Sequence, residues 1–246
     1  MSNLPKVKNE LKINLSPSLT DLKIIEKWLL AESIKHNEGF YCNWNIIKKS
    51  FTSNNLISLE LNENIIGFLI YSNGDIYIEI DIMEIHRDFR KRGFGKVFFE
   101  KFAEVFKDRH IIAIKLFCEP RESEYFWRKL GFIKFPSRGY SESDLTFYKP
   151  LIEVKSTTQK PNDLNKLELW DVEPYQATNK NPRWCWDVEL EKERIIRPII
   201  QPCNINWNLR WTKNGKIVKE DKVKYFSDTS NPIEFCPFMY VEKLIE

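Results

Sequence analysis

The chain has 246 residues, with 38 lysines and arginines against 35 aspartates and glutamates, so its formal net charge is only +3. This length predicts one large domain or two small ones, and the balanced charge argues against a nucleic-acid-binding protein. The sequence contains no apolar run of membrane-spanning length and no signal-peptide core near its start, so we expect a cytoplasmic protein with no membrane partner.

The cysteines and histidines form neither a disulfide pattern nor a zinc-binding pattern. The five cysteines are widely scattered without a Cys-x-x-Cys pair, and all three histidines lie in the first half of the chain. We therefore expect free thiols in a reducing compartment and no metal site.

The first 75 residues alternate between helix and strand patterns. Ser18 and Asp21 form a capping box, which predicts a helix whose apolar positions continue to Leu29. A loop is expected over 31–42 because that stretch is polar. The other predicted elements are a strand at 11–15, a helix at 43–51 and a strand pair at 56–61 and 65–71.

The rest of the chain is organised around the strand predicted at 76–82. Isoleucine occupies positions 76, 78, 80 and 82, and these side chains are expected on one face, with Glu79 and Asp81 on the other. Residues 83–89 are expected to connect this strand to a helix.

A glycine-containing turn opens that helix. Residues 90–96 read Arg-Lys-Arg-Gly-Phe-Gly-Lys, and phenylalanine then recurs at 94, 98, 102 and 106, as on the apolar face of a helix. The first turn of a helix offers unpaired N–H groups and the positive end of the helix dipole, which suits a phosphate. Gly93 and Gly95 let the backbone approach a ligand closely because they carry no side chain.

On the glycines alone, two other interpretations stay open. The turn could be an ordinary strand–helix connection with a basic surface cluster. A dinucleotide-binding turn would instead need a third glycine at the position that Phe98 occupies.

Beyond this helix, the sequence predicts a strand at 111–117, a helix at 122–130 ended by Gly131, and two closing strands at 132–135 and 145–148. This order of elements resembles the GNAT superfamily of N-acetyltransferases. Three motifs carry the resemblance: Arg-x-x-Gly-x-Gly at 90–95 after an acidic strand, the segment 126–132, and a last strand at 147–151. The resemblance covers roughly residues 10–151 and implies an α+β GNAT fold, with a mixed, splayed central sheet flanked by helices.

The resemblance also implies a cosubstrate, acetyl-CoA, and the residues that bind it. In the family the acidic strand splays at a bulge, where its backbone pairs with pantetheine and offers an N–H group to the oxyanion. The residues implied to bind acetyl-CoA are Met83, Ile85, Arg90, Lys91, Arg92, Gly93, Phe94, Gly95 and Lys96.

Acetyl transfer to an amine needs a base, because an alkylammonium group has a pKa of about 10.4 and no lone pair. Glu79 is the first candidate, since it lies eleven residues before Arg90, the spacing found in some histone-type members. Asp81, about 7 Å further along the strand, is the second candidate. Either carboxylate could instead be a solvated residue on an open strand face.

The chain departs from the family where many members carry an asparagine and a proton-donating tyrosine. Pro120 and Trp127 stand at those two positions. An indole cannot deliver a proton to a thiolate, and Tyr125 is expected on another face of the helix. The sequence therefore leaves the general acid unassigned.

The rest of the chain changes character. Residues 152–166 have the composition of a linker, and residues 167–246 predict a small β-rich accessory domain in which Asn214-Gly215 forms a hairpin. Five of the eight tryptophans are here, either in a core or stacked on single-stranded nucleic acid. Residues 151–246 hold 15 basic and 15 acidic side chains, which favours the core.

Two classes of function follow. The first is acetyl transfer from acetyl-CoA to a primary amine, in direct attack with a carboxylate base, on a GNAT domain at 1–151. A protein or peptide amine is the expected acceptor, with a small amine or an aminoacyl-tRNA as alternatives. The second class is a non-catalytic module that binds CoA for sensing or scaffolding. A homodimer is left open.

Overall fold

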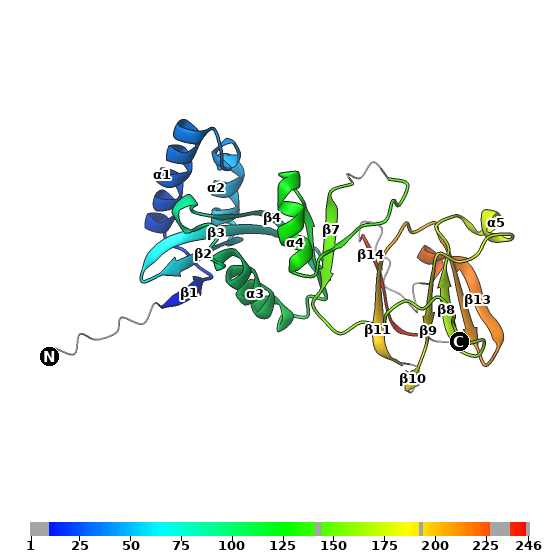
Figure 1. Ribbon diagram of the computed structural model, residues 1–246. Helices are drawn as coiled ribbons and strands as arrows, with labels where there is room; N and C mark the ends of the chain where they lie inside the picture. The colour runs from blue at the N-terminus through cyan, green and yellow to red at the C-terminus, as the bar shows by residue number, and fades with distance from the viewer. Residues whose placement is uncertain (1–9, 141–143, 192–193, 227–236, 245–246) are drawn as a thin grey trace. The chain divides into compact units, whose positions relative to one another are not determined.

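The computed structural model describes residues 10–140, 144–191, 194–226 and 237–244 (Figure 1). The chain divides into two units, one that ends at Phe132 and one that begins at Ile133. The domain limits predicted at 151 and 167 stay predictions.

The first unit is built on neighbouring strands in the order β1-β2-β3-β4-β5. They pair antiparallel, except that β4 and β5 are parallel. The bounds are β1 (Leu11–Asn14), β2 (Leu56–Leu61), β3 (Asn64–Asn73), β4 (Tyr77–Ile85) and β5 (Ala113–Phe117). The sheet is therefore mixed, as the sequence predicts.

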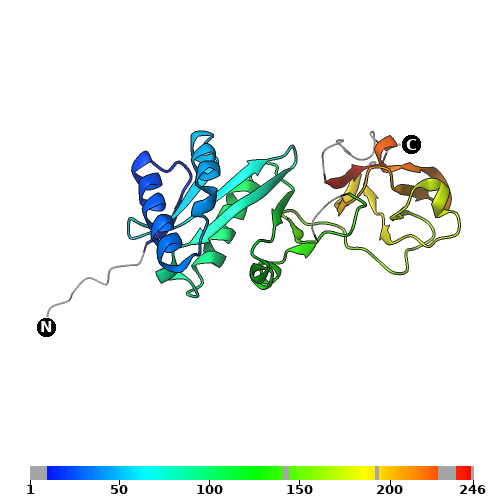
Figure 2. The ribbon, with the colours of Figure 1, turned by 90° about the horizontal axis from the view of Figure 1, so that it is seen from above.

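Helices cover both faces of this sheet. The helices α1 (Leu19–His36) and α2 (Trp44–Thr52) share a buried apolar cluster with Phe68, Ile70 and Ile82. Figure 1 shows them on one side of the strands and α3 (Phe94–Lys107) on the other, and in Figure 2 the blue helices lie over the cyan strands. On the α3 side, Phe102 and Phe106 contact the ring of Tyr71. The unit also contains α4 (Glu124–Lys129) and the short 3-10 turns η1 (Tyr41–Asn43), η2 (Arg87–Phe89) and η3 (Arg121–Ser123).

The first helix begins where the sequence predicts and ends later. The Asp21 backbone N–H donates to Ser18 Oγ at 3.2 Å, and the Ser18 N–H donates to Asp21 Oδ2 at 2.6 Å, so the capping box forms. The loop predicted from residue 31 is wrong over its first part, because α1 continues to His36. Glu32 continues the buried stripe of α1 one turn beyond Leu29, with only 5% of its surface exposed.

The central strand β4 contains a bulge, as the family resemblance implies, although the alternating pattern does not predict it. Ile82 pairs with Ile70 and Ile80 pairs with Tyr71, so Asp81 is the extra residue on β4. The expectation that all the isoleucines share one face is wrong: Ile80 shares the α3 face with Tyr71, and Ile82 packs on the α1–α2 side. The strand also runs on to Ile85 through residues predicted as a connection.

The second unit contains three sets of paired strands. They are the pair β6 (Ile133–Lys134) and β7 (Thr146–Pro150), a sheet in the order β10-β11-β14, and a sheet in the order β13-β12-β8-β9. The remaining bounds are β8 (Lys166–Leu169), α5 (Pro174–Ala177), β9 (Trp184–Asp187), β10 (Leu190–Glu191), β11 (Arg194–Pro202), β12 (Asn208–Lys213), β13 (Lys216–Lys222), η4 (Val223–Tyr225) and β14 (Phe238–Lys243). Within the β-rich stretch predicted at 167–246, residues 192–193, 227–236 and 245–246 lie outside the described residues.

The two β-sheets of this unit share one apolar core. Trp186 and Trp211 are among its fully buried side chains, together with Ile199 and Met239. The core interpretation of the tryptophans is therefore confirmed for these residues. Asn214 and Gly215 have φ values of 50° and 75°, so they form the predicted hairpin turn between β12 and β13.

The stretch predicted as a linker is hydrogen-bonded to the second unit. The backbone N–H of Lys155 donates to the Pro198 carbonyl at 2.9 Å, and that of Thr158 donates to the Cys185 carbonyl at 2.8 Å. In the part of the chain that the structure describes, no helix is both long and apolar enough to cross a membrane.

Candidate active site

The glycine turn places the start of α3 at the end of β4. Gly93 caps the helix with a φ of 85°, the left-handed region that glycine tolerates, and no described side chain caps the first N–H groups. No atom of the described residues would lie within 4 Å of a Cβ added to Gly93. The first turn of α3 can therefore offer its backbone N–H groups to an anion.

Gly95 is a packing position within this turn. A Cβ on Gly95 would lie 3.4 Å from the ring of Phe126 and 3.7 Å from Cγ1 of Ile85. Gly95 therefore brings the start of α3 against α4 and the end of β4.

The guanidinium of Arg90 is held by buried carboxylates. Its Nη2 atom lies 2.5 Å from Glu32 Oε2 and 2.8 Å from Glu84 Oε1, and its Nε donates to the Ile85 carbonyl at 2.8 Å. The predicted phosphate-binding role of the Arg90 side chain therefore competes with two carboxylates. Lys91 lies in the left-handed region with a φ of 61°.

The other cations of the turn are more exposed. The Arg92 guanidinium lies 5.6 Å from the centroid of the Phe89 ring, and Lys96 Nζ lies 3.7 Å from Glu100 on the exposed surface of α3. Exposed ion pairs of this kind are weak, so Lys96 can reorient toward a ligand at small energetic cost. Phe94 contacts the ring of Phe89.

A cleft of about 110 Å³ lies beside the bulge of β4. Its wall contains Asp81 and Met83 from β4, Phe126 from α4, and Phe40 from the loop after α1. The other lining residues are Ile80, Ile82, Leu116, Phe117, Glu119, Pro120, Ser123 and Trp127. Because Phe126 also faces Gly95, the cleft lies next to the start of α3.

Asp81 combines exposure to the cleft with a perturbed pKa. Although Asp81 is exposed, partial desolvation by the surrounding protein raises its pKa to about 6, and the negative charge of Glu79 adds to this effect. Ser72 Oγ donates to Asp81 Oδ1 at 3.3 Å, which opposes part of the rise. Near neutral pH, Asp81 is therefore an ionised carboxylate that can still accept a proton.

Glu79 has a different environment. Its two carboxylate oxygens lie 2.7 and 2.8 Å from Lys115 Nζ, and the two residues are neighbours across β4 and β5. Lys115 therefore occupies both oxygens of Glu79, and this ion pair would have to open before Glu79 could contact an amine.

The region of the missing tyrosine offers a hydroxyl from another residue. Trp127 is buried against Phe132 and Phe99, and Tyr125 is 68% exposed beneath Lys129. Ser123 lines the cleft, and its Oγ lies 3.3 Å from Cys118 Sγ.

Sequence reasoning missed three partners of the predicted site residues: Glu32, Glu84 and Lys115. For Lys115 there was a signal, since it is a cation within an otherwise apolar strand. For Glu32, the signal was its spacing of three residues from Leu29 on the buried helix face. The pairings of Glu32 and Lys115 depend on contacts between elements distant in the sequence, whereas Glu84 lies six residues before Arg90.

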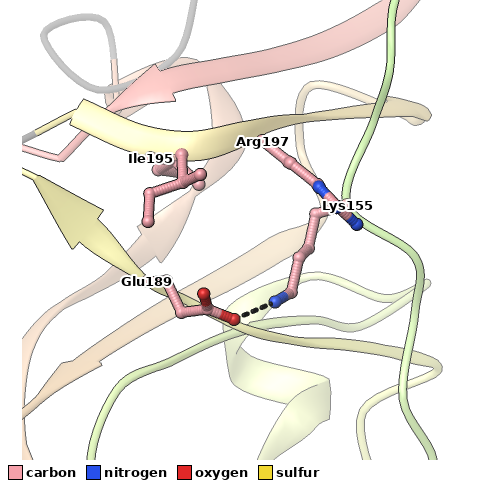
Figure 3. A pocket seen from close by; sticks show the side chains of 5 residues that line it. Lys155, Glu189, Ile195 and Arg197 are labelled. Carbon is pink, nitrogen blue, oxygen red and sulfur yellow. Dashed lines mark hydrogen bonds and ion pairs between the residues drawn. The ribbon is translucent and has the colours of Figure 1, made fainter.

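A hollow of about 180 Å³ in the second unit is lined by charged side chains, of which Lys155 and Glu189 form an ion pair (Figure 3). Lys155 Nζ lies 2.7 Å from Glu189 Oε1, and Arg197, on the same wall, lies 3.2 Å from Glu153. These ion pairs connect the stretch before β8 to its own unit. We assign no catalytic role to this hollow.

The bulged β4, the glycine turn and the adjoining cleft lie together in the first unit. Residues 23–132 match the model of the Acetyltransferase (GNAT) family. These residues form a GNAT acetyltransferase domain, and acetyl-CoA is the cosubstrate of that family. The GNAT fold predicted from the sequence is thus confirmed, with additional β-rich strands in the second unit.

Several solved structures resemble the chain over its GNAT part. An acetyltransferase of the GNAT family from Staphylococcus aureus Mu50 is 16% identical, with a TM-score of 0.47 over 58% of this chain and 100% of that chain. The ribosomal-protein-S18-alanine N-acetyltransferase from Escherichia coli is 17% identical, with a TM-score of 0.44 over 58% of this chain and 94% of that chain. The PaiA N-acetyltransferase from Thermoplasma acidophilum, in complex with coenzyme A, is 17% identical, with a TM-score of 0.44 over 57% and 99%. No curated protein sequence matches the chain.

Proposed function

We propose that the chain transfers the acetyl group of acetyl-CoA to a primary amine, with Asp81 as the general base. The observation that carries this proposal is the position of Asp81 at the bulge of β4, on the wall of the cleft beside the start of α3. Acetyl-CoA supplies the acetyl group as an activated thioester.

The residues of the turn fit the diphosphate of acetyl-CoA. The first N–H groups of α3 have no described side-chain cap, and the space around Gly93 is open. The negatively charged diphosphate, bound at the first turn of α3, would interact favourably with the helix dipole and with the nearby side chains of Arg92 and Lys96. Backbone groups near Met83 and Ile85, next to the bulge, are the proposed partners of the pantetheine arm.

The cleft supplies carboxylates that can attract an ammonium group and remove its proton before the amine attacks the thioester. Asp81 and Glu119 bring carboxylates to the cleft wall, and these favour the approach of a cationic amine. Asp81 then takes a proton from the ammonium group, directly or through water. Because it is paired with Lys115, Glu79 is the second candidate for the base. Its proposed role is to raise the pKa of Asp81 through its negative charge.

The leaving thiolate needs stabilisation, and Ser123 is the proposed donor. Ser123 lines the cleft, and so does Trp127, which stands where many family members carry a tyrosine. We propose a protein or peptide amine as the acceptor, because the second unit adds a separate β-rich core that the chemistry itself does not need.

Mass-spectrometric detection of acetyl transfer tests this proposal. The purified chain is incubated with acetyl-CoA and a panel of peptides, polyamines and other small amines, with Asp81→Asn as the matched control. We expect acetylation of at least one amine class and a large loss in the variant. Binding of acetyl-CoA without transfer to any amine would favour the non-catalytic alternative.

A further inference from the structure

One arginine bridges two buried carboxylates in the first unit. Glu32 from α1 and Glu84 from β4 are only 5% and 6% exposed, and both contact Nη2 of Arg90. Carboxylates that are this deeply buried are rare unless a cation holds them. The cluster therefore fixes the arrangement of three separate elements at once.

Glu32 contacts both a backbone group and a side chain in the segment between β4 and α3. Glu32 Oε1 accepts the backbone N–H of Arg87 at 2.9 Å, and Glu32 Oε2 contacts Arg90. Arg90 Nε in turn donates to the Ile85 carbonyl at 2.8 Å. These bonds connect α1, η2 and the end of β4 immediately before the helix that carries the proposed diphosphate site.

The same cluster contacts the loop that forms part of the cleft wall. A Cβ on Gly39, whose φ is 81°, would lie 3.2 Å from Glu84 Oε1 and 3.6 Å from Glu32 Oε2. The next residue, Phe40, lines the cleft, and its backbone hydrogen-bonds to the carboxylate of Glu84. The loop in the cleft wall and the glycine turn therefore both contact the buried cluster of Glu32, Glu84 and Arg90.

We infer that Glu32 is a positioning residue for acetyl-CoA binding. It acts through Arg90 and the N–H of Arg87 and holds the first turn of α3 where its backbone N–H groups can bind the diphosphate. Glu84 extends this support to the loop at Gly39 and Phe40. The inference rests on the proposed binding of acetyl-CoA at the glycine turn.

The variant Glu32→Gln separates the two roles of this side chain. The amide oxygen can still accept the N–H of Arg87, but the amide NH2 group faces the guanidinium of Arg90, so two donors meet. Glu38 offers a matched control, since it also contacts Arg87 and Arg90, at 2.7 and 3.6 Å, but is half exposed.

Isothermal calorimetry with acetyl-CoA is the test. We expect Glu32→Gln to weaken binding about tenfold and Glu38→Gln to change it less than about twofold. In an Arg90→Gln background, Glu32→Gln should add little, because it acts through Arg90. Equal affinities of the wild type and the folded Glu32→Gln variant for acetyl-CoA would overturn the inference. It would also be overturned if Glu32→Gln weakened binding by the same factor in the Arg90→Gln background as in the wild type.

Two further measurements keep positioning separate from folding. Hydrogen exchange of the amides at 87–96 should accelerate in Glu32→Gln, while the melting temperature reports the stability of the fold. If Glu32→Gln does not fold, Glu32→Asp replaces it, and wild-type affinity in that shorter variant would refute the inference. Failure of the wild type to bind acetyl-CoA would instead refute the proposed function.

Discussion

Lys115 holds both carboxylate oxygens of Glu79, with distances of 2.7 and 2.8 Å from its Nζ atom. Of the two carboxylates on this strand, it is Asp81, two residues further along β4, that lines the cleft. The negative charge of Glu79 still contributes to the raised pKa of Asp81, and Lys115 lowers that pKa. The two acidic residues of the strand therefore have different roles in the proposed reaction.

Asp81→Asn should lower kcat by about 10²- to 10⁴-fold, because this range is typical for the loss of a general base. Affinity for acetyl-CoA should change little, since the base acts on the amine. Glu79→Gln should have a smaller effect on kcat. Steady-state kinetics with the acceptor found in the amine panel, and calorimetry with acetyl-CoA, measure both quantities. A larger loss in Glu79→Gln than in Asp81→Asn would restore Glu79 as the base.

The pH profile should report the charge of Glu79. The rate of the wild type should fall as the pH drops through about 6, where Asp81 becomes protonated. Glu79→Gln removes a negative charge that raises this pKa and leaves Lys115, which lowers it. The acid limb of kcat/KM should therefore move to lower pH in the variant. An unchanged limb would show that another group controls it.

Glu84 should make folding stability depend on pH. Burial raises the pKa of Glu84 from 4.5 to about 7, and the charge of Glu32 adds to this rise while Arg90 opposes it. The folded chain thus retains a proton that the unfolded chain releases, so the stability contribution is full below about pH 4.5 and is lost as the pH rises through about 7. Glu84→Gln cannot titrate. Its free energy of unfolding relative to the wild type should rise by up to about 3 kcal/mol between pH 4.5 and 8, as measured by urea unfolding. A difference that stays constant with pH would contradict the raised pKa.

The two glycines of the turn should respond differently to substitution. Gly93→Ala places a side chain at a φ of 85°, which should cost about 1–2 kcal/mol of unfolding free energy. Gly95→Val should press its methyl groups into the Phe126 ring, shift α3, and weaken acetyl-CoA binding about tenfold or more. Gly95→Ala is the control, because its Cβ makes only a close van der Waals contact. Calorimetry with acetyl-CoA on the folded variants measures the affinity. If Gly95→Val bound acetyl-CoA as tightly as the wild type, the glycine turn would not be part of the binding site.

The elements of the first unit could be predicted because local patterns encode them. The capping box at Ser18, the apolar stripe of α3 and the glycine at 93 each depend on residues a few positions apart. The bulge at Asp81 could not be read from alternation, because a bulge changes the pairing register while the sequence still alternates.

The parts of the candidate site that sequence reasoning missed depend on tertiary packing. Glu32 lies 58 residues from Arg90 along the chain, and Lys115 lies 36 residues from Glu79. Polar residues of this kind predict loops or solvated surfaces when they are read locally. Only the folded structure shows that Glu32 is buried, that Lys115 is partly buried and that both are paired.

The second unit is held together by residues on both sides of the predicted linker. Before it, Phe135 and Tyr148 contact the ring of Phe238, with centroid distances of 5.6 and 5.5 Å. Lys155, within it, hydrogen-bonds to the backbone of β11. The strands β6 and β7, which complete the GNAT order in the sequence, therefore pack on the residues that follow them.

A fragment that ends at Lys155 should therefore be less soluble than the full chain. Arg138 is 7% exposed and donates from Nη1 to the carbonyls of Cys203 and Pro237, both at 2.9 Å, and the cut removes these acceptors together with Phe238. Buried donors without acceptors and exposed aromatic rings favour aggregation, so light scattering should detect large particles. In the full chain, Arg138→Met should lower the free energy of unfolding by about 3 kcal/mol, because two charge-assisted hydrogen bonds are lost. A soluble, monomeric fragment that binds acetyl-CoA with wild-type affinity would show instead that the GNAT part folds without the β-rich strands, and would leave those strands a role in acceptor choice alone.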